Sequence, residues 1–179
     1  MARNTISRSL HDIGLAAWFG GTLANAVALN AASGQTSNAA DSGRVANAGW
    51  DRWTPVNAAA IGAHLLGSVG QLGGNKSRLA AQSGVGKMAL VKTALTAGAL
   101  GVTAYSRTLG QKVSARPDVP VGDATSPAAG TPPEVAAAQK QLALLQWAVP
   151  ALTGALVVIS SFAGEQQRPS EVSKNLLKR

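Results

Sequence analysis

Four long apolar stretches separated by polar segments dominate the hydrophobic pattern of the chain. They cover residues 10–31, 54–73, 86–109 and 141–163. Each has ~20 residues or slightly more, and a helix of that length, at ~1.5 Å per residue, crosses a hydrocarbon core of ~30 Å. The pattern therefore predicts an all-α polytopic membrane protein, in which a single membrane domain over residues 1–179 forms a four-transmembrane-helix bundle.

Composition supports a membrane protein and limits the chemistry. Charged residues make up 13% of the chain, against ~25% in an average soluble domain. The apolar stretches are rich in Ala and Gly rather than Leu and Ile, so a soluble four-helix bundle is the alternative. The absence of cysteine excludes disulfides, thiolate metal sites and cysteine nucleophiles. Because the net charge of +8 is not gathered in a basic patch interleaved with aromatics, we expect no nucleic-acid partner.

The distribution of Lys and Arg predicts the topology. With a cytoplasmic N-terminus, the inner segments carry most of the basic residues, namely Arg3, Arg8, Lys76, Arg78, Lys87, Lys92, Arg168, Lys174, Lys178 and Arg179. The outer segments carry fewer, namely Arg44, Arg52, Arg107, Lys112, Arg116 and Lys140. This follows the positive-inside rule, so we expect both termini to be cytoplasmic.

The first stretch and the connections allow further expectations. Residues 10–31 resemble a signal peptide with a small-x-small site at Ala24–Ala26, but the apolar part exceeds the usual ~7–15 residues, which favours an uncleaved helix. Trp50 and Trp53 are expected at the headgroup level, where amphipathic rings accumulate. The segment 110–138, rich in Pro, Ala and Gly, is expected to be a flexible outer loop. Residues 164–179 are expected to form a cytoplasmic tail.

Polar and small residues recur at helical spacing within each apolar stretch. In the first stretch the stripe contains His11, Gly14, Trp18, Gly21, Asn25 and Ala28, and in the second it contains Asn57, Ala60, His64, Gly67 and Gln71. The stripe of the third stretch contains Lys92, Thr96, Ala99, Thr103 and Ser106, and that of the fourth contains Gln139, Gln146, Thr153 and Ser160. In lipid, helices associate through close packing of small residues and interhelical hydrogen bonds. We therefore expect these stripes to face one another, with a candidate polar seam of Asn25, Asn57, His64, Gln71, Gln146 and Thr153.

Ionisable side chains within the apolar stretches have a functional and a structural interpretation. His64, near the middle of its helix, could bind a solute or relay protons, or it could be a structural histidine that is hydrogen-bonded to Asn25 or Thr153. Lys92 is expected to extend its ammonium toward the cytoplasmic surface or to pair with Asp12 at the same membrane end, with Glu165 as a competing partner.

No cofactor, metal site or catalytic residue is expected. His11 lies at the start of its helix and His64 ~10 residues into its own, which predicts a depth difference of ~12 Å and argues against a shared haem. Two His, two Met and no Cys supply a copper pathway poorly. Metalloprotease, phosphate-loop, serine-hydrolase and paired-carboxylate motifs are absent from the sequence, so we expect no enzyme activity.

Two short motifs carry a family resemblance. The first stretch contains LHDIGLAAWFGG, with a His before an aromatic-Gly-Gly, and the third contains VKTALTAGALGVTAYSR, with a Lys near its start and an Arg near its end. Together they resemble the corresponding helices of copper-resistance-D-like four-helix integral membrane proteins of bacteria. The resemblance implies a four-helix membrane fold, and no metal ligands are transferred from it.

Two hypotheses for function follow. The first is a non-enzymatic accessory or scaffold subunit of a larger bacterial envelope complex, either transport or respiratory, because small-residue helix faces favour association with other membrane proteins or with itself. The second is a small carrier or channel-like protein that binds a small solute, an ion or protons in the polar seam around His64. Both place the chain in the bacterial inner membrane as a multi-pass protein, with the lipid bilayer as its surroundings.

Overall fold

The computed structural model describes residues 4–76 and 83–165, and the described part is helical. A continuous helix begins with α1 (Thr5–Ala24), passes through a π-helical turn, η1 (Asn25–Leu29), and ends with α2 (Asn30–Ala32). It is followed by α3 (Ala39–Gly74), α5 (Ser83–Ser114) and α6 (Pro133–Glu165). Within the described ranges, the one β-type contact is an isolated bridge between Val121 and Pro127. The expected all-α class is confirmed; most of the expected tail, 166–179, lies outside the described residues.

Three of the long helices have the length and apolar composition needed to cross a membrane. They are Thr5–Ala32, Gly84–Ser114 and Pro133–Gly164. The remaining helix, α3, has 36 residues and a length of ~54 Å, but polar side chains such as Asn57 and His64 lower its hydropathy. The helix α3 is therefore long enough to be a fourth span, but its composition alone does not identify it as one.

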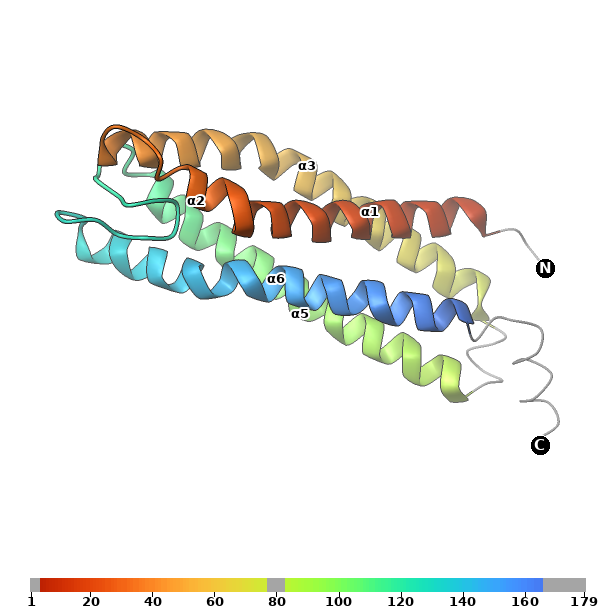
Figure 1. Cartoon of the computed structure of the whole chain (residues 1–179). Coiled ribbons are helices and arrows are strands. Elements are labelled where there is room, and N and C mark those ends of the chain that lie inside the picture. The colour runs from red at the N-terminus through yellow and green to blue at the C-terminus, as the bar shows by residue number, and fades with distance from the viewer. Residues whose placement is uncertain (1–3, 77–82, 166–179) are drawn as a thin grey trace.

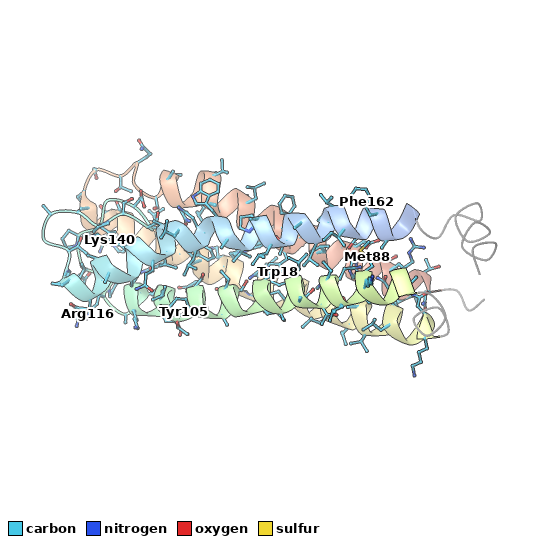
Figure 2. The ribbon with its side chains drawn as sticks, turned by 90° about the horizontal axis from the view of Figure 1, so that it is seen from below. Trp18, Met88, Tyr105, Arg116, Lys140 and Phe162 are labelled. Atoms are coloured by element: carbon cyan, nitrogen blue, oxygen red, sulfur yellow. The ribbon has the colours of Figure 1, made fainter. Side chains whose placement is uncertain are left out.

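The helices pack as two pairs (Figure 1). Along its length α1 packs on α3, α5 packs on α6, and α1 also packs on α6 to join the pairs, whereas α3 and α5 make few direct contacts. A small core contains one buried residue from each long helix: Trp18, Ala60, Ala99 and Val149. Figure 2 shows Trp18 between the helices, while Phe162 points away from the bundle. A seam therefore remains between α3 and α5.

The two ends of the bundle differ. At one end, here called the loop end, lie the connections formed by residues 33–38 and 115–132; at the other, the terminal end, α1 begins and α6 ends (Figure 1). All four long helices extend further toward the loop end than the apolar pattern predicts. Residues 39–53, expected in a polar loop, form the first turns of α3 because Asn38 caps this helix by accepting a hydrogen bond from the Asp41 amide at 2.9 Å.

The connection between α5 and α6 is fixed by hydrogen bonds, in contrast to the flexible loop expected over 110–138. The Val121 amide donates to the Ala39 carbonyl oxygen at 3.1 Å, and the Ala124 amide donates to Ser33 Oγ at 3.0 Å. Val121 and Ala124 are buried. Asp123 accepts hydrogen bonds from the Thr125 amide and from the Ser126 hydroxyl. Composition alone could not predict these tertiary contacts. Within the segment 110–138, the non-helical part is limited to residues 115–132.

Candidate functional site

Two glycines bring α1 and α3 into backbone contact. A Cβ atom added to Gly14 would lie 2.4 Å from His64 N, and one added to Gly67 would lie 2.2 Å from His11 N. Both distances are shorter than any real carbon–nitrogen contact, so only glycine fits at these two positions. This close approach places His11 and His64 opposite each other across the helix interface.

The two histidines form a buried pair. Their ring centroids lie 4.6 Å apart with an interplanar angle of 45°, and each residue is only 1% exposed. The equal depth contradicts the ~12 Å difference expected from sequence, because α1 begins before the apolar stretch does, which moves His11 deeper along the helix. Rings in direct contact leave no space for a porphyrin between them. The predicted depth difference is therefore wrong, and the contact between the rings, rather than their depth, disfavours a haem held between them.

Hydrogen bonds fix the orientation of both rings. His11 Nδ1 donates to the Asp12 carboxylate at 2.7 Å, which leaves His11 Nε2 buried and without a partner among the described residues. His64 Nδ1 lies 3.4 Å from the His11 carbonyl oxygen, and His64 Nε2 lies 3.4 Å from Thr96 Oγ1 on α5. The partners of His64 are thus neither Asn25 nor Thr153, the two that were expected.

The predicted ion pair between Asp12 and Lys92 is not formed in the structure. Asp12 contacts His11 instead, and no carboxylate among the described side chains lies within ion-pair distance of Lys92. Successive residues on a helix point ~100° apart, so the exposed Asp12 side chain turns back onto the ring of His11 rather than across to α5. The side chain of Glu165, the expected competitor, lies outside the described residues.

Two cavities lie along the seam between α3 and α5. The loop-end cavity has a volume of about 370 Å³ and is lined by residues from all four long helices, among them Asn25, Trp53, Asn57, Thr103 and Gln146. The terminal-end cavity has a volume of about 350 Å³ and is lined by His11, Gln71, Lys92 and Thr96 among others. Leu100 borders both cavities, and the contact between His64 and Thr96 crosses the seam nearby. Both volumes fall in the range of small-molecule sites, ~300–1,000 Å³.

The residues of the predicted polar seam do not form one continuous site, because they are divided between the two cavities and the helix interfaces. Asn25, Asn57 and Gln146 line the loop-end cavity, whereas Gln71 lines the terminal-end cavity. His64 lies in the α1–α3 interface and lines neither of these cavities. Thr153 is fully buried and donates to the Val149 carbonyl oxygen of its own helix at 2.8 Å.

The π-helical turn explains which residues the sequence pattern missed. In an α-helix, Asn25 and Asn30 would point ~140° apart. The i→i+5 hydrogen bonding of η1 (Asn25–Leu29) adds a residue to the turn and brings both side chains to the loop-end cavity, while Ala28, which the α-helical spacing placed in the stripe, is exposed. Asn30 then donates to Gln146 Oε1 at 2.8 Å and accepts from Trp50 Nε1 at 3.1 Å.

Two tryptophans that were expected at the headgroup level also line this cavity. Trp50 is held by Asn30, and Trp53 packs against Gly21, where an added Cβ would overlap the indole ring. Both lie inside α3 rather than before it, since this helix begins at Ala39. The sequence did contain a signal for this placement. Trp50, Trp53 and Asn57 are spaced by three and then four residues, and residues with this spacing share one face of a helix.

The loop-end cavity contains unsatisfied hydrogen-bonding groups. Among the described residues, five of its lining side chains have a buried polar atom without a protein partner: Asn25 Nδ2, Trp53 Nε1, Asn57 Oδ1, Thr103 Oγ1 and Ser106 Oγ. Asn25 is only 8% exposed. Buried polar groups are normally hydrogen-bonded, and five of the nine unpartnered atoms among the described residues belong to the lining of this one cavity.

Comparisons with known proteins add no family. No protein-family model matches the sequence, and no curated protein or solved structure shows a significant match to it. The resemblance to copper-resistance-D-like proteins therefore stays an expectation from two motifs.

Proposed function

We propose that the protein is a non-enzymatic, multi-pass membrane protein that binds a small solute in the seam between α3 and α5. The observation that carries this proposal is the loop-end cavity of about 370 Å³, whose lining includes five side chains that have a buried polar atom without a protein partner among the described residues. A buried polar group without a hydrogen-bond partner costs ~1–3 kcal/mol, so a solute that supplied partners to these groups would stabilise the bundle.

Four spans with both termini cytoplasmic account for the structure in this proposal. The three apolar helices supply three spans, and α3 supplies the fourth because its polar face is turned toward α1 and the seam rather than toward lipid. The loop end then faces outward from a bacterial inner membrane, in keeping with the basic residues of the inner segments.

The arrangement of the two cavities suggests a carrier-like or channel-like protein. One cavity lies toward each end of the bundle, and between them Leu100 and the contact of His64 with Thr96 narrow the seam. A solute that entered one cavity could reach the other if α3 and α5 moved apart, which is feasible because few contacts join these two helices.

Small molecules retained by the purified protein provide the test. After purification in mild detergent, native mass spectrometry of the wild type should detect a bound compound that the variant carrying Asn25→Leu and Asn57→Leu has lost. Ser161→Ala, an exposed position on α6 away from the cavities, is the matched control and should retain it. If wild type and double variant carry the same compounds in the same amounts, the proposed site is wrong.

The accessory-subunit hypothesis remains a second proposal, supported by the exposure of α5. Only 6% of its most apolar window is buried, and its face with Ala94, Gly98, Gly101 and Tyr105 is exposed. Open space surrounds Gly101, so another helix could approach closely. A tagged chain purified in mild detergent should then bring down partners in fixed stoichiometry, whereas a clean monomer would count against this role.

A further inference from the structure

The loop-end cavity combines apolar walls with polar side chains from several helices. Ile61, Leu142, Leu145 and Val149 contribute hydrophobic surface, and the rings of Trp50 and Trp53 add large apolar faces. The unpartnered polar atoms come from η1, α3 and α5. An occupant must therefore present a mainly apolar body together with some hydrogen-bonding atoms.

The unpartnered atoms indicate which hydrogen-bonding groups the occupant should offer. Asn25 Nδ2 and Trp53 Nε1 can only donate hydrogen bonds, and Asn57 Oδ1 can only accept one. The hydroxyls of Thr103 and Ser106 can do either. The complement is a group with at least two acceptor oxygens and one hydrogen-bond donor.

The charges around the cavity indicate that the occupant is neutral. Of the residues that line it, the one with a formal charge is Arg107, which is exposed. No described acidic side chain lines the cavity to balance a cation. An anion would have to leave its hydration shell against apolar walls, with a single solvated guanidinium to compensate, and burial of an uncompensated charge is very costly.

The position of the cavity provides a route from the bilayer. Both α3 and α5 line the cavity and make few contacts with each other, so in the proposed orientation the gap between them would connect the cavity with lipid. A molecule already dissolved in the bilayer could enter sideways without crossing the polar loop end.

We propose that the loop-end cavity binds an uncharged, lipophilic molecule that carries hydroxyl and carbonyl or ether oxygens and is taken from the bilayer. This inference rests on the proposed solute-binding function and specifies its ligand class. Two kinds of bilayer molecule share this chemistry, neutral glycerolipids and long-chain quinones in their reduced form. The cavity recognises the oxygens they have in common.

The test measures the binding of defined probes to the full-length protein in nanodiscs of zwitterionic lipid. The probes are 1,2-dioctanoylglycerol, a decyl-chain benzoquinol, and glutamate as a hydrophilic charged comparison. Trp50 and Trp53 line the cavity, so tryptophan emission reports occupancy. We expect a saturable change with at least one lipophilic probe, and competition between the two probes will show which is preferred.

Matched substitutions on α5 localise the binding. Thr103→Val removes an unpartnered hydroxyl that lines the cavity, whereas Thr108→Val makes the same change at an exposed position outside it. Loss of one hydrogen bond should weaken binding of the preferred probe about threefold to tenfold for Thr103→Val. Binding should be unchanged for Thr108→Val. If Thr103→Val does not accumulate, Ser106→Ala tests the neighbouring hydroxyl in the same way.

The outcomes separate this inference from the function on which it rests. Saturable binding of glutamate with no response to either lipophilic probe would overturn the ligand class and leave a solute site in place. No saturable response to any probe would overturn the ligand class as well. The proposed function itself fails only if no compound distinguishes the wild type from the double variant in native mass spectrometry. Equal weakening by Thr103→Val and Thr108→Val would place the bound probe elsewhere.

Discussion

At the scale of single residues, the contact between α1 and α3 depends on glycines that face backbone atoms. Gly14 and Gly67 lie where a side chain would overlap the opposite helix, and they allow the rings of His11 and His64 to stack. Gly62 also belongs to α3 but has no atom within 4 Å of an added Cβ. The same residue type therefore has two different roles on one helix.

This contrast predicts different effects of two alanine substitutions. Gly67→Ala should destabilise the protein by ~1–3 kcal/mol or more, because the helices must move apart to accommodate the methyl group. Gly62→Ala should be neutral or slightly stabilising, since Ala has the higher helix propensity. Thermal unfolding in detergent, monitored by circular dichroism, measures both. A similar decrease in midpoint for the two variants would contradict the tight contact.

The residue scale also shows what the spacing of polar residues could predict. The pattern selected Trp18, Ala60, His64, Gly67, Ala99 and Thr153 as interior residues, and all of them are buried. It assigned Ala28 to the same stripe, and Ala28 is exposed. The pattern assumes a constant ~100° per residue, and the π-helical turn breaks this assumption directly after Asn25. Nothing in the local sequence marks that turn.

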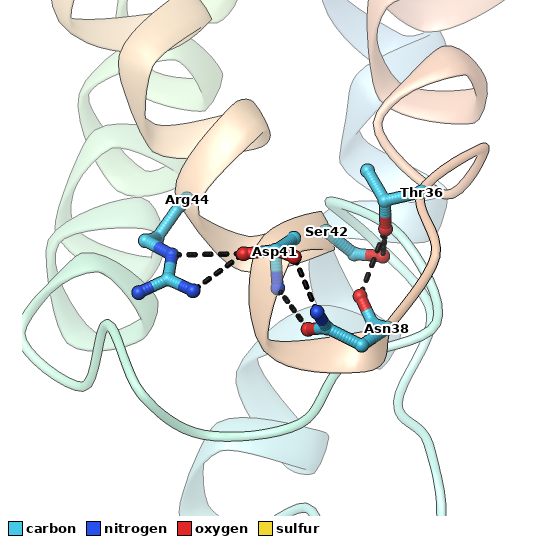
Figure 3. Close-up of polar contacts among 5 residues, drawn as sticks. All are labelled: Thr36, Asn38, Asp41, Ser42 and Arg44. Carbon is cyan, nitrogen blue, oxygen red and sulfur yellow. Dashed lines mark hydrogen bonds and ion pairs between the residues drawn. The ribbon is translucent and has the colours of Figure 1, made fainter.

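At the scale of elements, polar contacts at its first turn determine where α3 begins (Figure 3). Asn38 and Asp41 hydrogen-bond to each other, Arg44 pairs with Asp41, and the Thr36 hydroxyl contacts that of Ser42 at 2.7 Å. Hydrogen bonding to the Arg44 guanidinium, together with its charge, lowers the pKa of Asp41 below its usual range. The helix start therefore depends on an ionised carboxylate near the positive end of the helix dipole.

This arrangement predicts that the first turn of α3 loosens in acid. A carboxyl whose pKa is lowered by folding stabilises the helix start above its unfolded value of ~3.9 and loses that contribution as pH falls through the folded value. Amide hydrogen exchange over residues 39–44, corrected for intrinsic rates, should thus accelerate below about pH 4. In Asp41→Asn the protection should be lower at neutral pH and should change less on acidification. An identical pH profile in the variant would show that the carboxylate is irrelevant.

Element boundaries were less predictable than element identity. The sequence predicted four helices, but each is longer than its apolar stretch, because caps such as Asn38 and contacts such as that of Val121 with Ala39 order polar residues as well. Hydropathy detects the part of a helix that suits lipid, not the part that extends beyond it. This difference also explains why the depth of His11 was misjudged.

At the scale of the whole molecule, the proposed topology assigns the loop end and the terminal end to opposite sides of the membrane. The natural chain has no cysteine, so single introduced thiols report their side unambiguously. Ser37 at the loop end and Lys76 at the terminal end are both exposed. In intact bacterial cells, an impermeant maleimide should label Ser37→Cys, and it should label Lys76→Cys only after permeabilisation. Labelling of both in intact cells would exclude α3 as a span.

The pairing of the helices also has a consequence for biogenesis. The partners that pack most extensively, α1 with α3 and α5 with α6, are consecutive along the chain. Each pair can therefore assemble as an antiparallel hairpin as soon as its second helix has left the ribosome. The cavities arise only when the second hairpin docks against the first, because their walls come from both. A ligand present in the bilayer at that moment would favour docking, so occupancy of the seam and completion of folding would be thermodynamically linked.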